Sequence, residues 1–210
     1  MLGVDFGSTT GKAVVLDSDG VIRGSGVSAE GAVSDVGVKE AMAQALAEAG
    51  IAERDVARAV ATGYGRRMLD IADRTITEIT CHARGAVHLV PEARLVLDIG
   101  GQDSKVIAID EHGLVAQFQM NDRCAAGTGK FLETLADAMN VELEAMGPLA
   151  LGAQEDVKVS AMCATFASTE VIGLLAEGVD KVDILGGVHA AVAKRTAGMV
   201  SRVGLREPMV

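Results

Sequence analysis

Two glycine-containing loops each place an aspartate and a lysine seven residues apart. The first runs from Asp5 to Lys12, and the second runs from Asp98 to Lys105. Glycine and small hydroxyl residues let backbone amides approach phosphate oxygens, and a lysine ammonium adds a donor for a polyanion. A carboxylate at the end of a strand can hold a hydrated Mg²⁺. These residue types at this spacing predict two phosphate-binding loops that clamp one magnesium nucleotide.

The two loops belong to an internal repeat with an ungapped offset of 93 residues. Beyond the loops, Asp17 aligns with Asp110 and Gly20 aligns with Gly113. A single loop of this kind could equally be an ordinary hairpin with a polar turn. Two copies at a fixed offset favour the phosphate-binding interpretation over the hairpin.

The repeat also predicts the elements that carry the loops. Each copy reads as strand, glycine turn, strand, tight turn and strand. After the first copy, the apolar spacing predicts a helix over 36–50, a strand over 56–61 and a helix over 74–90. We therefore expect an α/β fold with two halves, 1–90 and 91–210.

Three helices are expected after the second copy. Apolar residues at helical spacing mark the first at Phe131, Leu135 and Met139, and the second from Ala167 onwards. The third is expected over 183–203.

Composition excludes several classes of protein. The chain of 210 residues has a net charge of −10, which argues against a nucleic-acid partner because phosphate neutralisation needs surplus Lys and Arg. No uncharged apolar run approaches the roughly 18–20 residues of a membrane span, and no apolar signal core is present at the N-terminus. Three cysteines argue against a secreted disulfide framework. We expect a soluble cytoplasmic protein with no membrane partner.

Four stretches of the sequence resemble one family of ATPases. They are DFGSTTGK at 5–12, IGGQDSK at 99–105, MNDRCAAGTG at 120–129 and CATFA at 163–167. The phosphate loops are similar to those of the actin, Hsp70 and sugar-kinase superfamily, whose duplicated, ribonuclease H-like fold has two halves flanking a nucleotide cleft. The cysteine-containing stretches narrow the resemblance to the activators of 2-hydroxyacyl-CoA dehydratases and the ATPase subunits of benzoyl-CoA reductases.

The resemblance implies a function. In that family, ATP hydrolysis drives a low-potential electron from a [4Fe–4S] cluster into a partner acyl-CoA dehydratase or reductase. It implies ATP or ADP, Mg²⁺ and one cluster per dimer as cofactors, and a low-potential ferredoxin or flavodoxin as electron donor. The dimer would form with a second copy or with a paralogue.

The resemblance also assigns roles to residues. Asp5 and Asp98 would organise Mg²⁺ and its waters, and Gln102 would position the attacking water. The remaining nucleotide contacts would come from small and polar residues of the two loops and of the CAAGTG stretch. They are Gly7, Ser8, Thr9, Thr10, Lys12, Gly100, Gly101, Asp103, Ser104, Gly127, Thr128 and Gly129.

The cysteines carry the more specific expectation. Cys124 and Cys163 each stand just before an expected helix, where unpaired N–H groups and the helix dipole favour a thiolate. By resemblance they are the cluster ligands, two from each subunit. A cysteine can also be a small buried apolar residue, and that interpretation is kept for Cys81.

Two other functions fit the same loops. A small-molecule kinase of the amino-sugar type would share the fold but would leave Cys124 and Cys163 unexplained. A non-catalytic scaffold of the actin or chaperone type is the third interpretation.

Members of the family that the sequence resembles continue with a further strand, an adenosine-binding Gly-Gly turn and a closing helix. We therefore expect the second half to be incomplete at its C-terminus.

Overall fold

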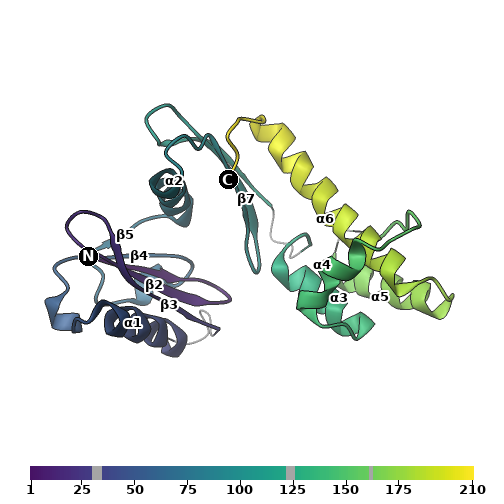
Figure 1. Ribbon diagram of the computed structural model, residues 1–210, viewed down its shortest axis with the longest axis horizontal. Coiled ribbons are helices and arrows are strands. Elements are labelled where there is room, and N and C mark those ends of the chain that lie inside the picture. The colour runs from purple at the N-terminus through teal and green to yellow at the C-terminus, as the bar shows by residue number, and fades with distance from the viewer. Residues whose placement is uncertain (30–34, 122–125, 161–162) are drawn as a thin grey trace. The chain divides into compact units, whose positions relative to one another are not determined.

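The computed structural model describes residues 1–29, 35–121, 126–160 and 163–210. It divides into two compact units, Met1–Gly85 and Ala86–Val210, which are drawn in Figure 1. The division falls within helix α2 (Glu78–Leu89), a few residues before the boundary expected from the sequence.

The first unit is built on a five-stranded sheet with the order β3-β2-β1-β4-β5. The central strand β1 pairs antiparallel with β2 and parallel with β4. Its strands are β1 (Leu2–Phe6), β2 (Gly11–Leu16), β3 (Ile22–Ser28), β4 (Ala59–Thr62) and β5 (Arg74–Thr75). Alternate residues of β1 are buried because they pack in one core with helix α1 (Val36–Ala49). That helix ends at Gly50, as expected.

The second unit contains a three-stranded antiparallel sheet with the order β6-β7-β8. Its strands are β6 (Leu95–Ile99), β7 (Ser104–Ile109) and β8 (Val115–Met120). Residues 208–210 run parallel beside β6, where the amide of Leu97 donates to the carbonyl of Val210 at 2.8 Å. This segment pairs parallel with β6, just as β4 pairs parallel with β1.

The repeat seen in the sequence is confirmed in the backbone. Strands β6 and β7 begin and end 93 residues after β1 and β2. The tight turns also match, because Asp17 accepts from the amides of Asp19 and Val21 as Asp110 accepts from those of His112 and Leu114. The two sheets are therefore two copies of one hairpin unit.

These turns make stability depend on pH. The backbone hydrogen bond from Leu114 is the largest influence that holds the pKa of Asp110 below its usual value. A lowered folded-state pKa means that the stabilisation is present above the unfolded-state pKa and is lost as pH falls through the folded one. The urea midpoint of the wild type should fall between about pH 5 and about pH 3, and we expect this fall to be smaller in Asp110→Asn. The neighbouring exposed Glu111→Gln is the control, and an unchanged slope in Asp110→Asn would contradict this account.

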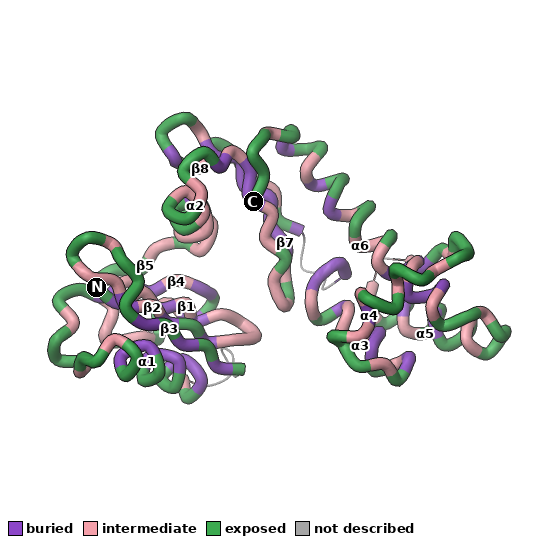
Figure 2. The backbone as a smooth tube through the Cα atoms, in the orientation of Figure 1, coloured by how far each residue is buried: buried purple, intermediate pink, exposed green. Residues whose placement is uncertain are grey.

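The helices of the second unit share a separate apolar core. They are α3 (Gly129–Met139), α4 (Leu143–Ala150), α5 (Ala164–Ala176) and α6 (Lys181–Val203). The buried side chains include Phe131, Leu135, Val171 and Ile184. Figure 2 shows buried stretches interspersed with exposed ones along these helices. The three helices expected after the second copy are confirmed, and α4 is an addition that the sequence did not predict.

The helix expected over 74–90 begins later than predicted. Arg74 and Thr75 instead form β5, which pairs parallel with Val60 and Ala61 of β4. The hydroxyl of Thr77 then accepts from the amide of Thr80 near the start of α2. The pairing with β4 takes precedence over the helical spacing of apolar residues. Such pairing cannot be recognised from the local sequence.

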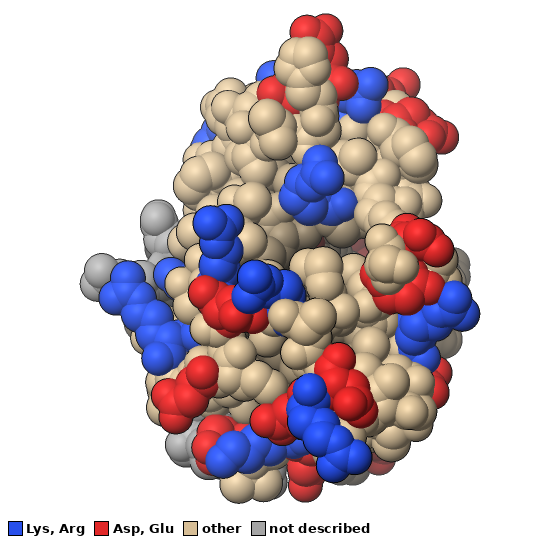
Figure 3. Space-filling model, turned by 90° about the vertical axis from the view of Figure 1, so that its left-hand side faces the viewer, with Lys and Arg blue, Asp and Glu red and all other residues tan. Residues whose placement is uncertain are grey.

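Charges of both signs are interspersed on the face seen in Figure 3. Several charged side chains of the described residues form ion pairs at the surface, such as Arg23 with Asp17 at 2.7 Å. Exposed pairs of this kind add little to stability. Among the described residues, no helix is both long enough and apolar enough to cross a membrane.

Candidate functional site

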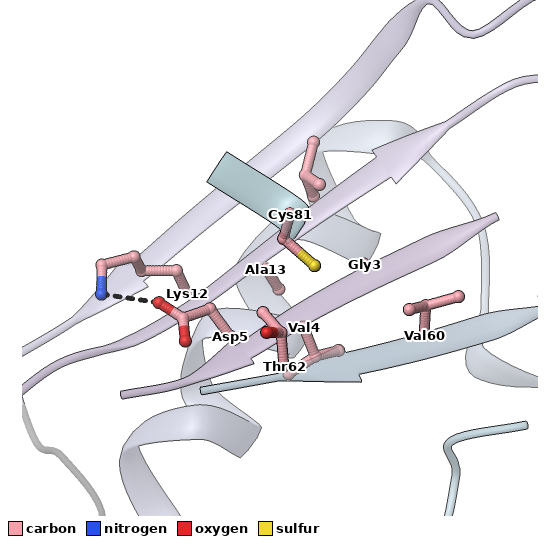
Figure 4. Close-up of a pocket in the computed structure, with 9 residues that line it drawn as sticks. Gly3, Val4, Asp5, Lys12, Ala13, Val60, Thr62 and Cys81 are labelled. Carbon is pink, nitrogen blue, oxygen red and sulfur yellow. Dashed lines mark hydrogen bonds and ion pairs between the residues drawn. The ribbon is translucent and has the colours of Figure 1, made fainter. Parts of the chain in front are cut away.

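The first glycine loop joins β1 to β2 and is closed by its own backbone. The amide of Gly7 donates to the carbonyl of Thr10 at 3.1 Å. Asp5 lies at the end of β1, and its carboxylate holds the ammonium of Lys12 at 3.0 Å (Figure 4). The Lys12 side chain is 47% exposed, so it can turn towards a ligand.

Hydroxyl groups of the same loop add potential donors. Ser8, Thr9 and Thr10 are all partly buried. The hydroxyl oxygen of Thr9 is buried and makes no hydrogen bond to the described part of the chain. A buried polar atom without a partner is costly unless a ligand or water supplies one. The loop therefore has the donor set that phosphate oxygens require.

Gly63 lies against Asp5 of the first loop, and it was not among the site residues predicted from the sequence. It follows β4, has a φ of +86°, and lies so close to β1 that a Cβ atom would stand 2.2 Å from a carboxylate oxygen of Asp5. Only glycine fits this approach without displacing that carboxylate. The signal available in the sequence was a glycine two residues after the strand expected over 56–61.

A cavity of about 240 Å³ opens beside Asp5 and Lys12. Figure 4 shows it bounded by β1, β2, β4 and the start of α2, with Cys81 over the sheet. Burial raises the pKa of the Cys81 thiol, which makes it a poor nucleophile or metal ligand at neutral pH. Cys81 is half-buried, and its surroundings match the apolar interpretation given to it.

The second glycine loop has the same backbone hydrogen bond as the first, but its lysine lies in a different environment. The amide of Gly100 donates to the carbonyl of Asp103 at 2.8 Å, as in the first loop. Lys105 is only 3% exposed and pairs with Asp98 at 3.2 Å and with Asp103. Lys105 is therefore held by the protein, whereas Lys12 faces solvent. Gln102 is exposed at the tip of this loop.

The difference between the two lysines predicts different mutant phenotypes. Lys105→Met would leave the carboxylates of Asp98 and Asp103 without their buried cation, so we expect it to lower the free energy of unfolding by about 1–3 kcal/mol. Lys12→Met removes a mostly exposed pair and should lower it by less than about 1 kcal/mol. Urea denaturation of both variants checks this, and equal losses would show that the loops are not asymmetric.

Residues 127–130, the described end of the CAAGTG stretch and the lysine after it, lie against the second loop. Ser104 is buried, and its hydroxyl donates to the carbonyl of Gly127 at 3.2 Å. The amide of Gly129 donates to the carbonyl of Gly100, and that of Lys130 donates to Gly101, both at 2.9 Å. Thr128 is buried at the N-cap of α3. The structure thus joins Gly100, Gly101 and Ser104 of the second loop to the backbone of 127–130.

Cys163 is the N-cap residue of α5. The backbone N–H groups of Phe166 and Thr165, at the start of α5, hold the pKa of its thiol below the usual value. A thiolate at a helix start suits an anionic iron–sulfur cluster. Cys124, the other predicted ligand, lies outside the described residues. Among the residues that are described, no three His, Cys, Asp or Glu side chains form a metal-binding group.

Comparisons with known proteins show the family of this chain. A family model described as the BadF/BadG/BcrA/BcrD ATPase family matches residues 2–210. A relative named activator of lactoyl-CoA dehydratase, from Anaerotignum propionicum, is 43% identical over 209 residues, which is all of this chain and 80% of the relative.

Solved structures give the same result for the fold. The crystal structure of (R)-2-hydroxyglutaryl-CoA dehydratase component A from Acidaminococcus fermentans matches with a TM-score of 0.92 and 40% identity, over all of this chain and 80% of that one. The 2-hydroxyisocaproyl-CoA dehydratase activator from Clostridium difficile with bound ADPNP also matches with a TM-score of 0.92, at 38% identity over all of this chain and 78% of that one.

A more distant structure shows the fold alone. The ethanolamine utilization protein EutJ from Carboxydothermus hydrogenoformans has a TM-score of 0.60 at 15% identity, over 99% of this chain and 74% of that one. The α/β ATPase fold and the family resemblance that we expected from the sequence are both confirmed. The chain belongs to the BadF/BadG/BcrA/BcrD ATPase family.

Proposed function

We propose that this protein hydrolyses ATP to drive a low-potential electron into a partner acyl-CoA dehydratase or a related reductase. The observation that carries the proposal is Cys163, which is the N-cap residue of α5 and whose thiol pKa is lowered by the backbone N–H groups of Phe166 and Thr165. A nucleotide-dependent kinase or scaffold has no use for a thiolate in that position. The names of the relatives, which are activators of acyl-CoA dehydratases, support the choice of partner.

The two loops supply the nucleotide chemistry in this proposal. Lys12 and the hydroxyls of the first loop neutralise and orient the phosphates, and Asp5 and Asp98 hold the waters of a bound Mg²⁺. Gln102, exposed on the second loop, orients the attacking water. Phosphoryl transfer needs positioning and charge stabilisation more than a strong base, so these groups are sufficient.

Cys163 and Cys124 are the proposed ligands of a [4Fe–4S] cluster. When bound, such a cluster supplies one-electron transfer at low potential. Two cysteines from each chain give four ligands only in a dimer, so we propose a dimer with a second copy or with a paralogue. The helix start at Cys163 stabilises negative charge at the ligand sulfur. A ferredoxin or flavodoxin is the proposed electron donor.

Anaerobic purification separates this function from that of an amino-sugar kinase. We expect brown protein that is bleached by oxygen, and an ATP hydrolysis rate that is unchanged by N-acetylglucosamine. Colourless protein whose ATP consumption rises with the sugar would refute the proposal and favour the kinase.

A further inference from the structure

The two glycine loops differ in charge. The first loop has one carboxylate, Asp5, and one ammonium, Lys12, so it is neutral. The second loop repeats this pair as Asp98 and Lys105, and it adds Asp103 where the first loop has a threonine. The second loop therefore has one negative charge in excess. Because carboxylates attract a divalent cation and repel phosphate oxygens, the two loops are not interchangeable.

A buried ammonium joins the two carboxylates of the second loop. Nζ of Lys105 lies 3.2 Å from Oδ2 of Asp98 and also pairs with Oδ1 of Asp103. The Lys105 side chain is 3% exposed, whereas those of Asp98 and Asp103 are 24% and 42% exposed. A ligand can therefore reach the two carboxylates from solvent, while the cation that neutralises them belongs to the protein interior.

The strand pairing keeps this ammonium in place. Lys105 lies on β7 directly opposite Asp98 of β6 in the antiparallel register, and the loop between them is closed by the Gly100 amide, which donates to the Asp103 carbonyl at 2.8 Å. The equivalent Lys12 can leave its carboxylate by turning into solvent. Lys105 has no such freedom, because its side chain is almost entirely buried.

The donor set of the second loop fits a magnesium ion. Mg²⁺ is usually bound through one or two carboxylates, and waters and substrate phosphates complete its ligands. Asp98 and Asp103 supply two carboxylates of this kind. The Lys105 ammonium takes one oxygen atom of each and offsets part of their charge. A free divalent cation must compete with this ammonium, which is always present because it is part of the chain.

We infer that Lys105 is a positioning residue that acts as an internal counter-ion and keeps the second loop from binding a divalent cation without nucleotide. The phosphates of a nucleotide supply the further ligands and negative charge that a free cation lacks, so magnesium enters and leaves together with the nucleotide. The inference rests on the proposed function only in placing a magnesium nucleotide at this loop. Lys105 acts through Asp98 and Asp103 and contacts no phosphate.

The test is a titration of the nucleotide-free, full-length chain with Mn²⁺, in which electron paramagnetic resonance measures the free ion. Mn²⁺ prefers the same carboxylate and water ligands as Mg²⁺. Lys105→Met keeps an unbranched side chain but removes its charge. We expect Mn²⁺ to bind this variant at least about 10-fold more tightly than the wild type, because a full charge within hydrogen-bonding distance has a large effect near a protein surface.

Three further variants separate this role from a merely structural one. Lys105→Arg keeps the positive charge and should bind Mn²⁺ as weakly as the wild type. The double variant Lys105→Met with Asp103→Asn loses one of the two carboxylates and should return to weak binding. Lys12→Met is the matched control from the equivalent position of the repeat. It leaves a single carboxylate, Asp5, so the affinity for Mn²⁺ should stay at the wild-type level.

The stability of Lys105→Met gives a second readout. Mn²⁺ should raise the urea midpoint of this variant more than that of the wild type, because the bound ion replaces the missing ammonium. If Lys105→Met unfolds without metal, refolding it from urea in the presence of Mn²⁺ applies the same test. A chain that stays unfolded in Mn²⁺ would overturn the inference.

Failure of the inference and failure of the proposed function give different results. Wild-type protein that binds no Mg-ADP in a calorimetric titration would refute the proposed function. Normal Mg-ADP binding together with equal Mn²⁺ affinities in the wild type and Lys105→Met would overturn the inference alone. Tight Mn²⁺ binding by the double variant would also overturn it, because the ion would then be held elsewhere.

Discussion

Cys163→Ser is expected to abolish iron binding and the brown colour of the protein. Replacing this one thiolate removes two of the four proposed ligands from a dimer, and two cysteines are too few to hold a [4Fe–4S] cluster. The effect is therefore all-or-none. It is measured by visible absorbance and iron content after anaerobic reconstitution.

Two other cysteine variants make this result interpretable. Cys124→Ser should be colourless for the same reason. Cys81→Ser should stay brown, because that thiol lies beside the cavity of the first unit and burial raises its pKa. A brown Cys163→Ser together with a colourless Cys81→Ser would overturn the assignment of the ligands.

Lys12→Ala should lower ATP hydrolysis by roughly 10²- to 10³-fold, the effect of losing one charge-stabilising donor in a transition state. The Lys12 ammonium is paired with Asp5, and its side chain is 47% exposed, so it is available to the phosphates. The cluster should remain in place, because the loop belongs to the first unit and Cys163 belongs to the second.

Lys39→Ala is the matched control for this prediction. Lys39 lies on α1 and forms a more exposed ion pair with Asp35, at 2.5 Å. Its removal should leave hydrolysis unchanged. Equal rates in the wild type and Lys12→Ala would show that the first loop does not bind the phosphates.

The repeat made much of the fold predictable from the sequence. Both copies share turn residues such as Asp17 and Asp110, so the strands predicted in one copy support those predicted in the other. Both three-stranded units were predicted correctly. Helix α4 was missed because Gly147 and Pro148 lie within it, and both residues ordinarily disfavour a helix. Its apolar side chains are ordered by packing with the other helices of the second unit.

The asymmetry between the two loops was not predicted from the sequence. Lys12 and Lys105 occupy equivalent places in the repeat, and only tertiary burial distinguishes them. The contact of Ser104 with Gly127 likewise joins residues that the sequence assigned to separate motifs. Such differences arise from packing between elements, which spacing along the chain does not encode.

The measurement that tests the central claim most directly is the iron and sulfide content of anaerobically purified protein, determined together with its mass in solution. The account predicts a dimer that holds about four irons and four sulfides, as a single cluster ligated by Cys124 and Cys163 of both chains requires. Protein that contains no iron after anaerobic reconstitution, in either monomeric or dimeric form, would contradict it.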